Sequence, residues 1–168
     1  MIEDLRGEFY QNLDSKNRII IPRRLSGRLV AENQGQIVVT RGVEFCLWIY
    51  PLATFQVMEG QVKKKMNPFD PRAQRFTNAY FSGVQEETLD KGARFVLSRH
   101  LLEYAQIKKE VVLVGSLYRI QVWSKERWED QIRQFSVNAN DIAEEMMSNF
   151  DGFWGQQTPS ESEPQSDN

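Results

Sequence analysis

Short apolar runs, rather than long ones, dominate the hydrophobic pattern of this 168-residue chain. They are rich in Val, Ile and Phe and are bounded by Gly, Pro, Asp or Asn, which is typical of β-strands joined by turns. The pattern predicts extended segments at 7–13, 18–21, 36–41, 45–50, 95–97, 110–114 and 118–123. Helices are expected after Pro22 and Ser98, and again from near Pro51 and Ser124. An α+β fold follows.

Residues 67–83 carry the signals of a connecting helix. Asp70 stands at an N-cap position, Pro71 at the first helical position and Gly83 at the stop. We expect the helix to pack through one face, which is formed by Phe76, Ala79 and Tyr80.

The C-terminal part is predicted to hold a short helix and a disordered end. Asp141 and Glu144 match a capping box, which predicts a terminal helix over 140–150. Residues 151–168 have the polar, proline-containing composition of a disordered segment.

The chain also contains an internal repeat. Six residues recur with a shift of 76, namely Gly7, Leu13, Asp14, Arg18, Arg23 and Leu25 as Gly83, Leu89, Asp90, Arg94, Arg99 and Leu101. Residues 38–55 then align with 111–128 at a shift of 73, which pairs Gly42 with Gly115, Leu47 with Ile120, Ile49 with Val122 and Phe55 with Trp128. We interpret this as a tandem duplication. One copy is too small for a secure core, so the two copies are expected to interleave their strands with approximate twofold symmetry.

These patterns divide the chain into five parts. They are a first repeat at 7–55, connecting helices at 56–82, a second repeat at 83–128, a C-terminal helix at 129–150 and an acidic disordered tail at 151–168.

Charge is distributed unevenly although the net charge is only −2. Residues 129–168 hold nine acids against one base, and residues 1–128 hold 20 bases against 14 acids. The basic body therefore permits a nucleic-acid partner without requiring one.

Compartment signals point to the cytoplasm. Cys46 is the only cysteine, which excludes an internal disulfide and favours a reducing compartment. No apolar run approaches the ~18–20 residues of a membrane span, and the start lacks the pattern of a signal peptide. We expect no membrane association.

Catalysis has little support. His100 is the only histidine, on a predicted helix, and is interpreted as a surface or packing residue. Cys46 lies in a predicted strand and is interpreted as an inert filler. No nucleophile motif, phosphate-binding loop or metal-ligand spacing is present, so we expect no enzyme, metal or cofactor.

The duplicated Asp-x-x-x-Arg turns are the main functional signal. In a structural interpretation, Asp14 and Asp90 stabilise the turns through their own backbone and pair with Arg18 and Arg94. Such surface pairs seldom stabilise a protein by more than ~1 kcal/mol, so stability alone explains the basic bias poorly. In a functional interpretation, each Arg reaches guanine O6 and N7 in the major groove of DNA.

Lys16 and Asn17 beside the first turn and Lys91 beside the second are candidates for contacts to phosphates that fix the register on DNA. A basic cluster follows, formed by Arg23, Arg24, Arg28 and Arg99, with Arg6 just before the first strand. Two lysine runs, 63–65 and 108–109, are interpreted as solvated surface. Four aromatic residues are expected to pack in the core or an interface rather than to stack on bases, namely Tyr50, Phe55, Trp123 and Trp128.

The sequence resembles the MraZ family of bacterial transcriptional regulators of the division and cell wall gene cluster, built from two SpoVT-AbrB repeats. The resemblance extends from about Gly7 to Gln134 and includes "RGEF" (6–9), "LDSKNRIIIP" (13–22), "YPL" (50–52), "NP" (67–68), "RF…FSG" (75–83), "KKEVVLVG" and "VWSKERW" (108–128). It implies a swapped-hairpin, barrel-like β core, a ring-shaped homo-oligomer, and binding to double-stranded DNA. The DNA sites implied are short direct repeats in the promoter of its own operon, where family members usually act as repressors in the nucleoid.

Carried over by motif, the resemblance places DNA contacts on Lys16, Asn17 and Arg18, with Arg6, Arg23 and Arg24 in support. In the second repeat it places them on Arg94, with Lys91 and Arg99 beside it.

The turns depart from the family pattern, which usually reads Asp-x-Lys-Gly-Arg. Asn17 stands in place of that Gly, and the second turn has its Gly one position earlier, at Gly92. Asn tolerates a positive φ better than most residues, so the first turn is expected to keep its shape. Ser98 replaces the usual proline of the second copy. The first turn is therefore expected to be the more intact DNA reader, and the second to serve mainly in assembling the core.

Two other functions remain open from the sequence. One is an antitoxin-like protein of the same fold, whose acidic tail binds a toxin. The other is a ring-forming scaffold protein that does not bind DNA.

Overall fold

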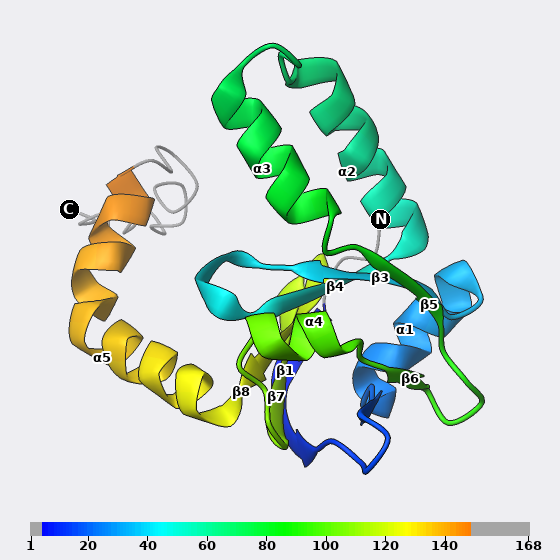
Figure 1. Cartoon of the computed structure of the whole chain (residues 1–168). Helices are drawn as coiled ribbons and strands as arrows, with labels where there is room; N and C mark the ends of the chain where they lie inside the picture. Colours follow the sequence, from blue (N-terminus) through cyan, green and yellow to red (C-terminus); the bar gives the residue numbers. More distant parts are fainter. Residues whose placement is uncertain (1–4, 149–168) are drawn as a thin grey trace, which may run out of the picture. The chain divides into compact units, whose positions relative to one another are not determined.

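Two antiparallel sheets carry the fold, as the computed structural model shows (Figure 1). The larger sheet has six strands in the order β1 (Leu5–Asn12), β7 (Glu110–Leu117), β8 (Arg119–Ser124), β4 (Leu47–Pro51), β3 (Gln36–Arg41) and β5 (Gln85–Thr88). The smaller sheet pairs β2 (Arg18–Ile20) with β6 (Arg94–Val96). Together with the helices, these sheets confirm the predicted α+β class.

Five α-helices and one 3-10 turn complete the described structure, namely α1 (Arg23–Asn33), η1 (Val43–Phe45), α2 (Leu52–Lys65), α3 (Pro71–Phe81), α4 (Arg99–Tyr104) and α5 (Lys125–Ser148). The structure describes residues 5–148, except for the side chains of 30–33 and 147–148. The predicted tail at 151–168 lies outside these residues. By contacts, the chain divides into two units after Glu129.

The two repeats exchange their first strands. β1 of the first repeat pairs with β7 of the second, and β5 of the second repeat pairs with β3 of the first. When each strand is replaced by its counterpart in the other repeat, the same sheet order is obtained, counted from the opposite edge. Because each repeat completes the sheet of the other, the structure confirms the predicted interleaving.

An approximate twofold axis passes between equivalent residues in both sheets. Ile19 pairs with Phe95, its counterpart at the shift of 76, and Trp48 pairs with Gln121, its counterpart at the shift of 73. Equivalent residues can face each other in an antiparallel pair only where a twofold axis crosses it.

One detail of the sequence alignment is wrong. Gly115 pairs with Ile120, and Leu47, the counterpart of Ile120, pairs with Arg41. Arg41, not Gly42, is therefore the structural counterpart of Gly115. The two hairpins differ at their tips, where η1 extends the first one, so the alignment needs a further shift of one residue in β3.

The main core combines side chains from both repeats, such as Leu5, Ile19, Leu47, Phe95 and Val122. Burying an aliphatic side chain of this size contributes roughly 1.5–3 kcal/mol relative to leaving it exposed. The exchanged strands therefore make the repeats depend on each other for stability.

A second, aromatic cluster lies under α2 and α3, built from Val38, Tyr50 and Phe55 with Tyr80 and Phe81 packed against them. Trp123 is also buried, and its ring centroid lies 5.9 Å from that of Trp128. These rings pack within the protein, as predicted.

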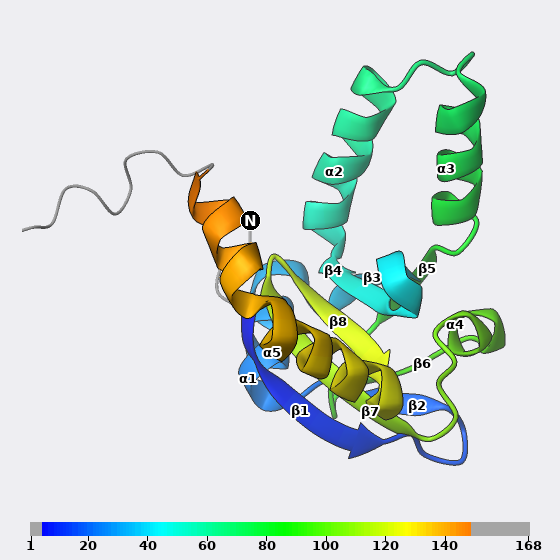
Figure 2. The same cartoon turned by 90° about the vertical axis from the view of Figure 1, so that its left-hand side faces the viewer.

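α2 and α3 form an antiparallel helical hairpin that stands on the sheet (Figures 1 and 2). α3 begins as predicted: the Asp70 carboxylate accepts a hydrogen bond from the Arg72 backbone N–H, and Pro71 follows at the first position. α4 differs, because Ser98 occupies the N-cap position without a side-chain capping bond. Its backbone N–H instead donates to Gln85 Oε1 over 3.1 Å.

α5 corrects the predicted short helix at 140–150. It is a continuous helix of 24 residues, in which Asp141 and Glu144 lie in the interior rather than at a start. No Gly or Pro stands between Lys125 and Ser148 to end the helix, so the capping-box pattern does not interrupt it.

Within residues 5–148, no helix is both long enough and apolar enough to cross a bilayer.

Candidate nucleic-acid interface

The first turn is held together by the side chain of Asp14. One carboxylate oxygen, Oδ1, accepts hydrogen bonds from the backbone N–H groups of Lys16 (2.8 Å) and Arg18 (2.9 Å). The other oxygen, Oδ2, accepts from Arg18 Nε over 2.6 Å. The Asn17 N–H closes the turn on the Asp14 carbonyl at 3.1 Å.

The second turn repeats this network. Asp90 Oδ1 accepts from the backbone N–H groups of Gly92 (2.8 Å) and Arg94 (2.9 Å), and Oδ2 accepts from Arg94 Nε at 2.9 Å. The structural interpretation of both aspartates is therefore confirmed. It leaves the DNA interpretation open, because each Asp occupies only the Nε side of its Arg.

A residue with positive φ lies just before each Arg, as Asn17 (φ 57°) and Ala93 (φ 56°). Asn17 adopts the conformation expected of it. In the second turn Ala93, not Gly92, adopts the positive φ, which is strained for a residue with a Cβ. The carbonyls of these residues accept from Leu97 N–H (3.0 Å) and Ile21 N–H (2.9 Å), so each turn is bonded to the opposite repeat.

The hydrogen bonds also stabilise the ionised carboxylates. Backbone and side-chain donation by Arg18 lowers the pKa of Asp14 to about 2. Donation by the Arg94 and Gly92 backbones lowers the pKa of Asp90. Both aspartates are therefore charged at neutral pH and fix the orientation of the adjacent guanidinium groups.

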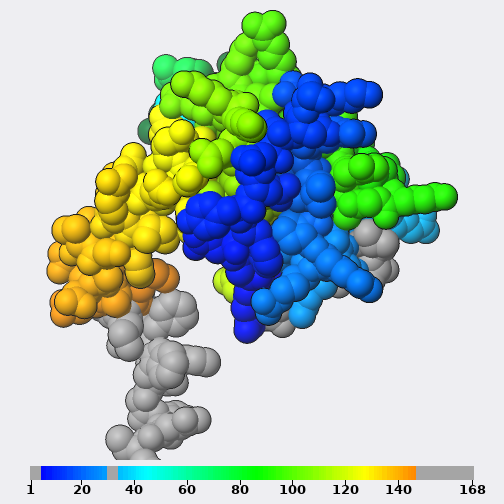
Figure 3. Space-filling view, turned by 90° about the horizontal axis from the view of Figure 1, so that it is seen from below, coloured from blue at the N-terminus to red at the C-terminus, as the bar shows by residue number. Residues whose placement is uncertain are grey.

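Arg18 and Arg94 lie on the same face of the small sheet. Arg18 is opposite Val96 and Arg94 is opposite Ile20, while the central pair, Ile19 and Phe95, is buried. Neighbouring residues of a strand point to opposite faces, so the two arginines share the outward face. They occupy diagonal positions, whose Cα atoms are roughly 7–8 Å apart. Figure 3 shows atoms of the first repeat (blue) and of the second (green) together on the face seen from below.

The guanidinium groups keep donors for a ligand. The side chains of Arg18 and Arg94 are 35% and 42% exposed. Their Nη groups make no hydrogen bond to any residue of the described part of the chain. Each Arg can thus offer two parallel N–H donors while Nε stays bonded to Asp.

The other predicted residues are exposed but are not all near this face. Lys16 and Asn17 lie in the first turn and Lys91 in the second. Arg23, Arg24 and Arg99 stand at the starts of α1 and α4, the helices that directly follow β2 and β6. Arg99 Nε donates a hydrogen bond to Glu103 Oε1 over 2.7 Å.

Arg6 is separate from the first turn. It lies at the opposite end of β1, roughly 20 Å along the strand from Asn12.

Sequence reasoning missed the apolar and amide residues of this site. Ile20 and Val96 are 51% and 46% exposed beside the arginines. Gln11 bonds the free edge of β2 through Ile20, and Gln85 bonds the edge of β6 through Val96. The alternation around Ile19 and Phe95 was a usable signal for Ile20 and Val96, whereas the two glutamines are not at equivalent positions in the repeats.

The candidates for reactive chemistry stay as interpreted. Cys46 is 1% exposed and lies just before β4, and burial raises the pKa of its thiol to about 12, which makes it unreactive. His100 is exposed on α4. Among the described residues, no group of three or more His, Cys, Asp or Glu side chains could hold a metal ion.

Comparison with known proteins identifies the family. The model described as "MraZ protein, putative antitoxin-like" matches the chain twice, over residues 5–79 and 80–150. The chain belongs to the MraZ family. The two matches agree with the duplication found in the sequence and in the sheet.

Relatives within the MraZ family cover most of the chain. Transcriptional regulator MraZ of Clostridium acetobutylicum is 40% identical over 140 residues, which is 83% of this chain and 94% of that protein. The protein of the same name from Lactobacillus johnsonii is 39% identical over 141 residues, 83% and 94% of the two chains. That of Finegoldia magna is 34% identical over 137 residues, 82% and 92% of the two chains.

Proposed function

We propose that this MraZ family member is a transcriptional regulator that binds double-stranded DNA at short direct repeats in the promoter of its own operon. Its expected effect is repression of the division and cell wall gene cluster. The relatives' name, transcriptional regulator, supports regulation of transcription. The observation that carries the proposal is the pair of Asp-held arginines on one exposed face of the β2·β6 sheet.

The chemistry of this face suits the major groove. A guanidinium with two parallel N–H donors matches O6 and N7 of guanine. The backbone positions of Arg18 and Arg94 are roughly 7–8 Å apart, about two base-pair steps, so the two side chains would read bases within one site. Ile20 and Val96 are exposed on the same face and would contact thymine methyl groups.

The surrounding basic residues would hold the DNA backbone. Lys16, Asn17 and Lys91 flank the arginines in the two turns, and Arg23, Arg24 and Arg99 open the following helices. Contacts from such residues to phosphates fix register and orientation without selecting sequence. Arg6, at the far end of β1, would reach DNA only outside the central site.

We further propose a ring-shaped homo-oligomer that acts in the cytoplasm, at the nucleoid. A single pair of arginines gives modest affinity, whereas several subunits on one ring could engage successive repeats at high effective concentration.

The substitution Arg18→Ala tests the base-reading role. Losing a bidentate guanine contact costs roughly 1–3 kcal/mol, so the affinity for a promoter fragment is expected to fall about tenfold or more. Gel shifts with the full chain and the DNA upstream of its own gene measure this. Arg75→Ala, which removes the same charge from α3, is the control and should change affinity less than twofold.

Size-exclusion chromatography of the Arg18→Ala protein separates the possible causes. An unchanged oligomer with lost specific binding supports base reading. If the oligomer collapses instead, Arg18 has a structural role, and if the promoter affinity is unchanged, the proposed site is wrong.

The antitoxin-like alternative is favoured by one finding, the description of the family model itself. Capture of a small basic protein by this chain, with no shift of the promoter fragment, would support that function instead.

A further inference from the structure

The distal part of α5, residues 130–148, carries a regular apolar stripe. Its members follow one another at alternating spacings of three and four residues, namely Ile132, Phe135, Ala139, Ile142 and Met146. This is the spacing of a helix that packs along its length against other helices. The stripe is therefore expected to pack against another surface.

This stripe is not used in the cores of the described structure. Ile132, Phe135, Ile142 and Met146 are 42%, 56%, 40% and 55% exposed. None of them belongs to either hydrophobic cluster of residues 5–148. A helix with this much exposed apolar surface is expected to be covered in the assembled protein.

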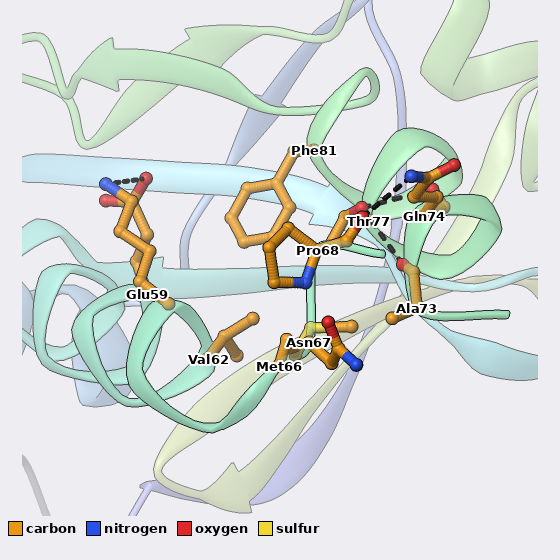
Figure 4. A pocket seen from close by; sticks show the side chains of 10 residues that line it. Glu59, Val62, Met66, Asn67, Pro68, Ala73, Gln74, Thr77 and Phe81 are labelled. Carbon is orange, nitrogen blue, oxygen red and sulfur yellow. Dashed lines mark hydrogen bonds and ion pairs between the residues drawn. The ribbon is translucent and has the colours of Figure 1, made fainter. Parts of the chain in front are cut away.

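The helical hairpin offers a groove of matching kind. Between α2 and α3 lies a cavity of about 380 Å³ (Figure 4). Apolar and polar residues line it in equal number, and most of its accessible surface is apolar. Val62 and Met66 approach it from the α2 side, Ala73 and Thr77 from α3, and Phe81 lies at its base. A third helix laid along this groove would complete a three-helix arrangement.

The net charges of the helices favour α5 as the helix that occupies the α2–α3 groove. Residues 130–148 of α5 hold four acids, Asp130, Asp141, Glu144 and Glu145, against Arg133. The hairpin at 52–81 holds five bases against two acids, with Lys64 and Lys65 exposed at the end of α2. Pairing α5 with the hairpin therefore brings opposite charges together, whereas pairing two α5 helices would bring like charges together.

We infer that the distal part of α5 from one copy docks in the α2–α3 groove of a second copy. This inference deepens the proposed homo-oligomer and rests on it. The contact is head-to-tail, because the helix and the groove are different surfaces. Such contacts continue from copy to copy and produce a ring when the rotation closes.

Two variants and two matched controls test the contact in the full-length protein. Phe135→Asp places a charge in the apolar stripe, and Val137→Asp places it two positions along the helix, on the opposite face. Val62→Asp places a charge in the groove, and Val57→Asp places it on α2 at an exposed position that does not line the groove.

Light scattering after size-exclusion chromatography gives the mass of each protein, with circular dichroism as the check on folding. Wild type and both controls should form the same oligomer. Phe135→Asp and Val62→Asp should each remain monomeric when alone. Mixed in equal amounts they should form a dimer, because the first retains its groove and the second retains its helix.

Other outcomes separate the failures. Oligomers that persist in both variants would overturn this contact while leaving the homo-oligomer intact. Disruption by Phe135→Asp alone, with no rescue on mixing, would show that α5 pairs with itself. A wild type that is monomeric at every concentration would remove the homo-oligomer as well, whereas DNA binding by the monomer would still be measurable.

Discussion

At the residue scale, each turn depends on one carboxylate that bonds its own backbone and the next arginine. The Asp14 and Asp90 networks span only five residues each. They couple a turn conformation to the orientation of a guanidinium group, so the same residue serves stability and the proposed recognition.

The strained conformation of Ala93 gives a stability prediction. Its φ of 56° is costly for a residue with a Cβ, so Ala93→Gly should raise the free energy of unfolding by about 0.5–1 kcal/mol, after the entropy that Gly adds to the unfolded chain. Chemical denaturation measures the change. Ala79→Gly, in the interior of α3, should lower stability by about 1 kcal/mol and so serves as the opposite control.

Acid should loosen both turns. The folded-state pKa of Asp14 is about 2 and that of Asp90 is also lowered, so their contribution is complete above the ordinary pKa of Asp and is lost as pH falls through the folded values. Denaturation curves between pH 5 and 2, compared with a double Asp14→Asn, Asp90→Asn variant, check this. The variant should be less stable at pH 7 and should lose less stability on acidification; a parallel loss in both proteins would contradict the assignment.

At the element scale, neither outer edge of the β2·β6 sheet pairs with another strand, and each edge is instead hydrogen-bonded by a glutamine side chain. Gln11 both donates to the Ile20 carbonyl (2.6 Å) and accepts from the Ile20 N–H (3.1 Å). Gln85 bonds Val96 and Ser98 in a similar way. These bonds satisfy the backbone of a very short sheet and protect its edges from pairing with other chains.

Removing one of these glutamines should weaken the sheet. Gln11→Ala is expected to destabilise the protein by about 0.5–1.5 kcal/mol, the usual net contribution of such hydrogen bonds. Hydrogen exchange should show faster exchange of the Ile20 amide. Gln56→Ala on α2 is the control; equal effects of both substitutions would mean that the edge bonds contribute nothing specific.

At the scale of the whole molecule, the exchange of β1 and β5 joins two small repeats into one core and brings both arginines to one surface. With the proposed function, one copy would then present one compound DNA site rather than two separate ones. In a ring, these sites would recur at regular intervals, which matches the proposed direct repeats in DNA.

Repetition of sites predicts cooperative binding. A fragment with four repeats should bind more tightly than one with two, and a lone repeat should bind weakly. Gel shifts with fragments of one length that differ only in intact repeats measure this. Equal affinity for all three would refute the avidity argument without bearing on the base contacts of a single site.

Local sequence was sufficient to predict the strands, the turns and the duplication. Asp14 and Asp90 act within four residues of chain, and the tendency of Asn17 to adopt a positive φ is its own. Interactions this short depend little on the rest of the fold, so the residues alone determined them.

Pairing between distant strands was decided only in the tertiary structure. That Arg18 and Arg94 share one face, that Gln11 and Gln85 cover its edges, and that Arg41 rather than Gly42 corresponds to Gly115 all follow from the strand register. Register is chosen by the packing of whole hydrophobic faces, and a shift of one residue reverses every side chain. The register therefore depends on how the complete faces of the two repeats pack together, and no short stretch of sequence specifies it.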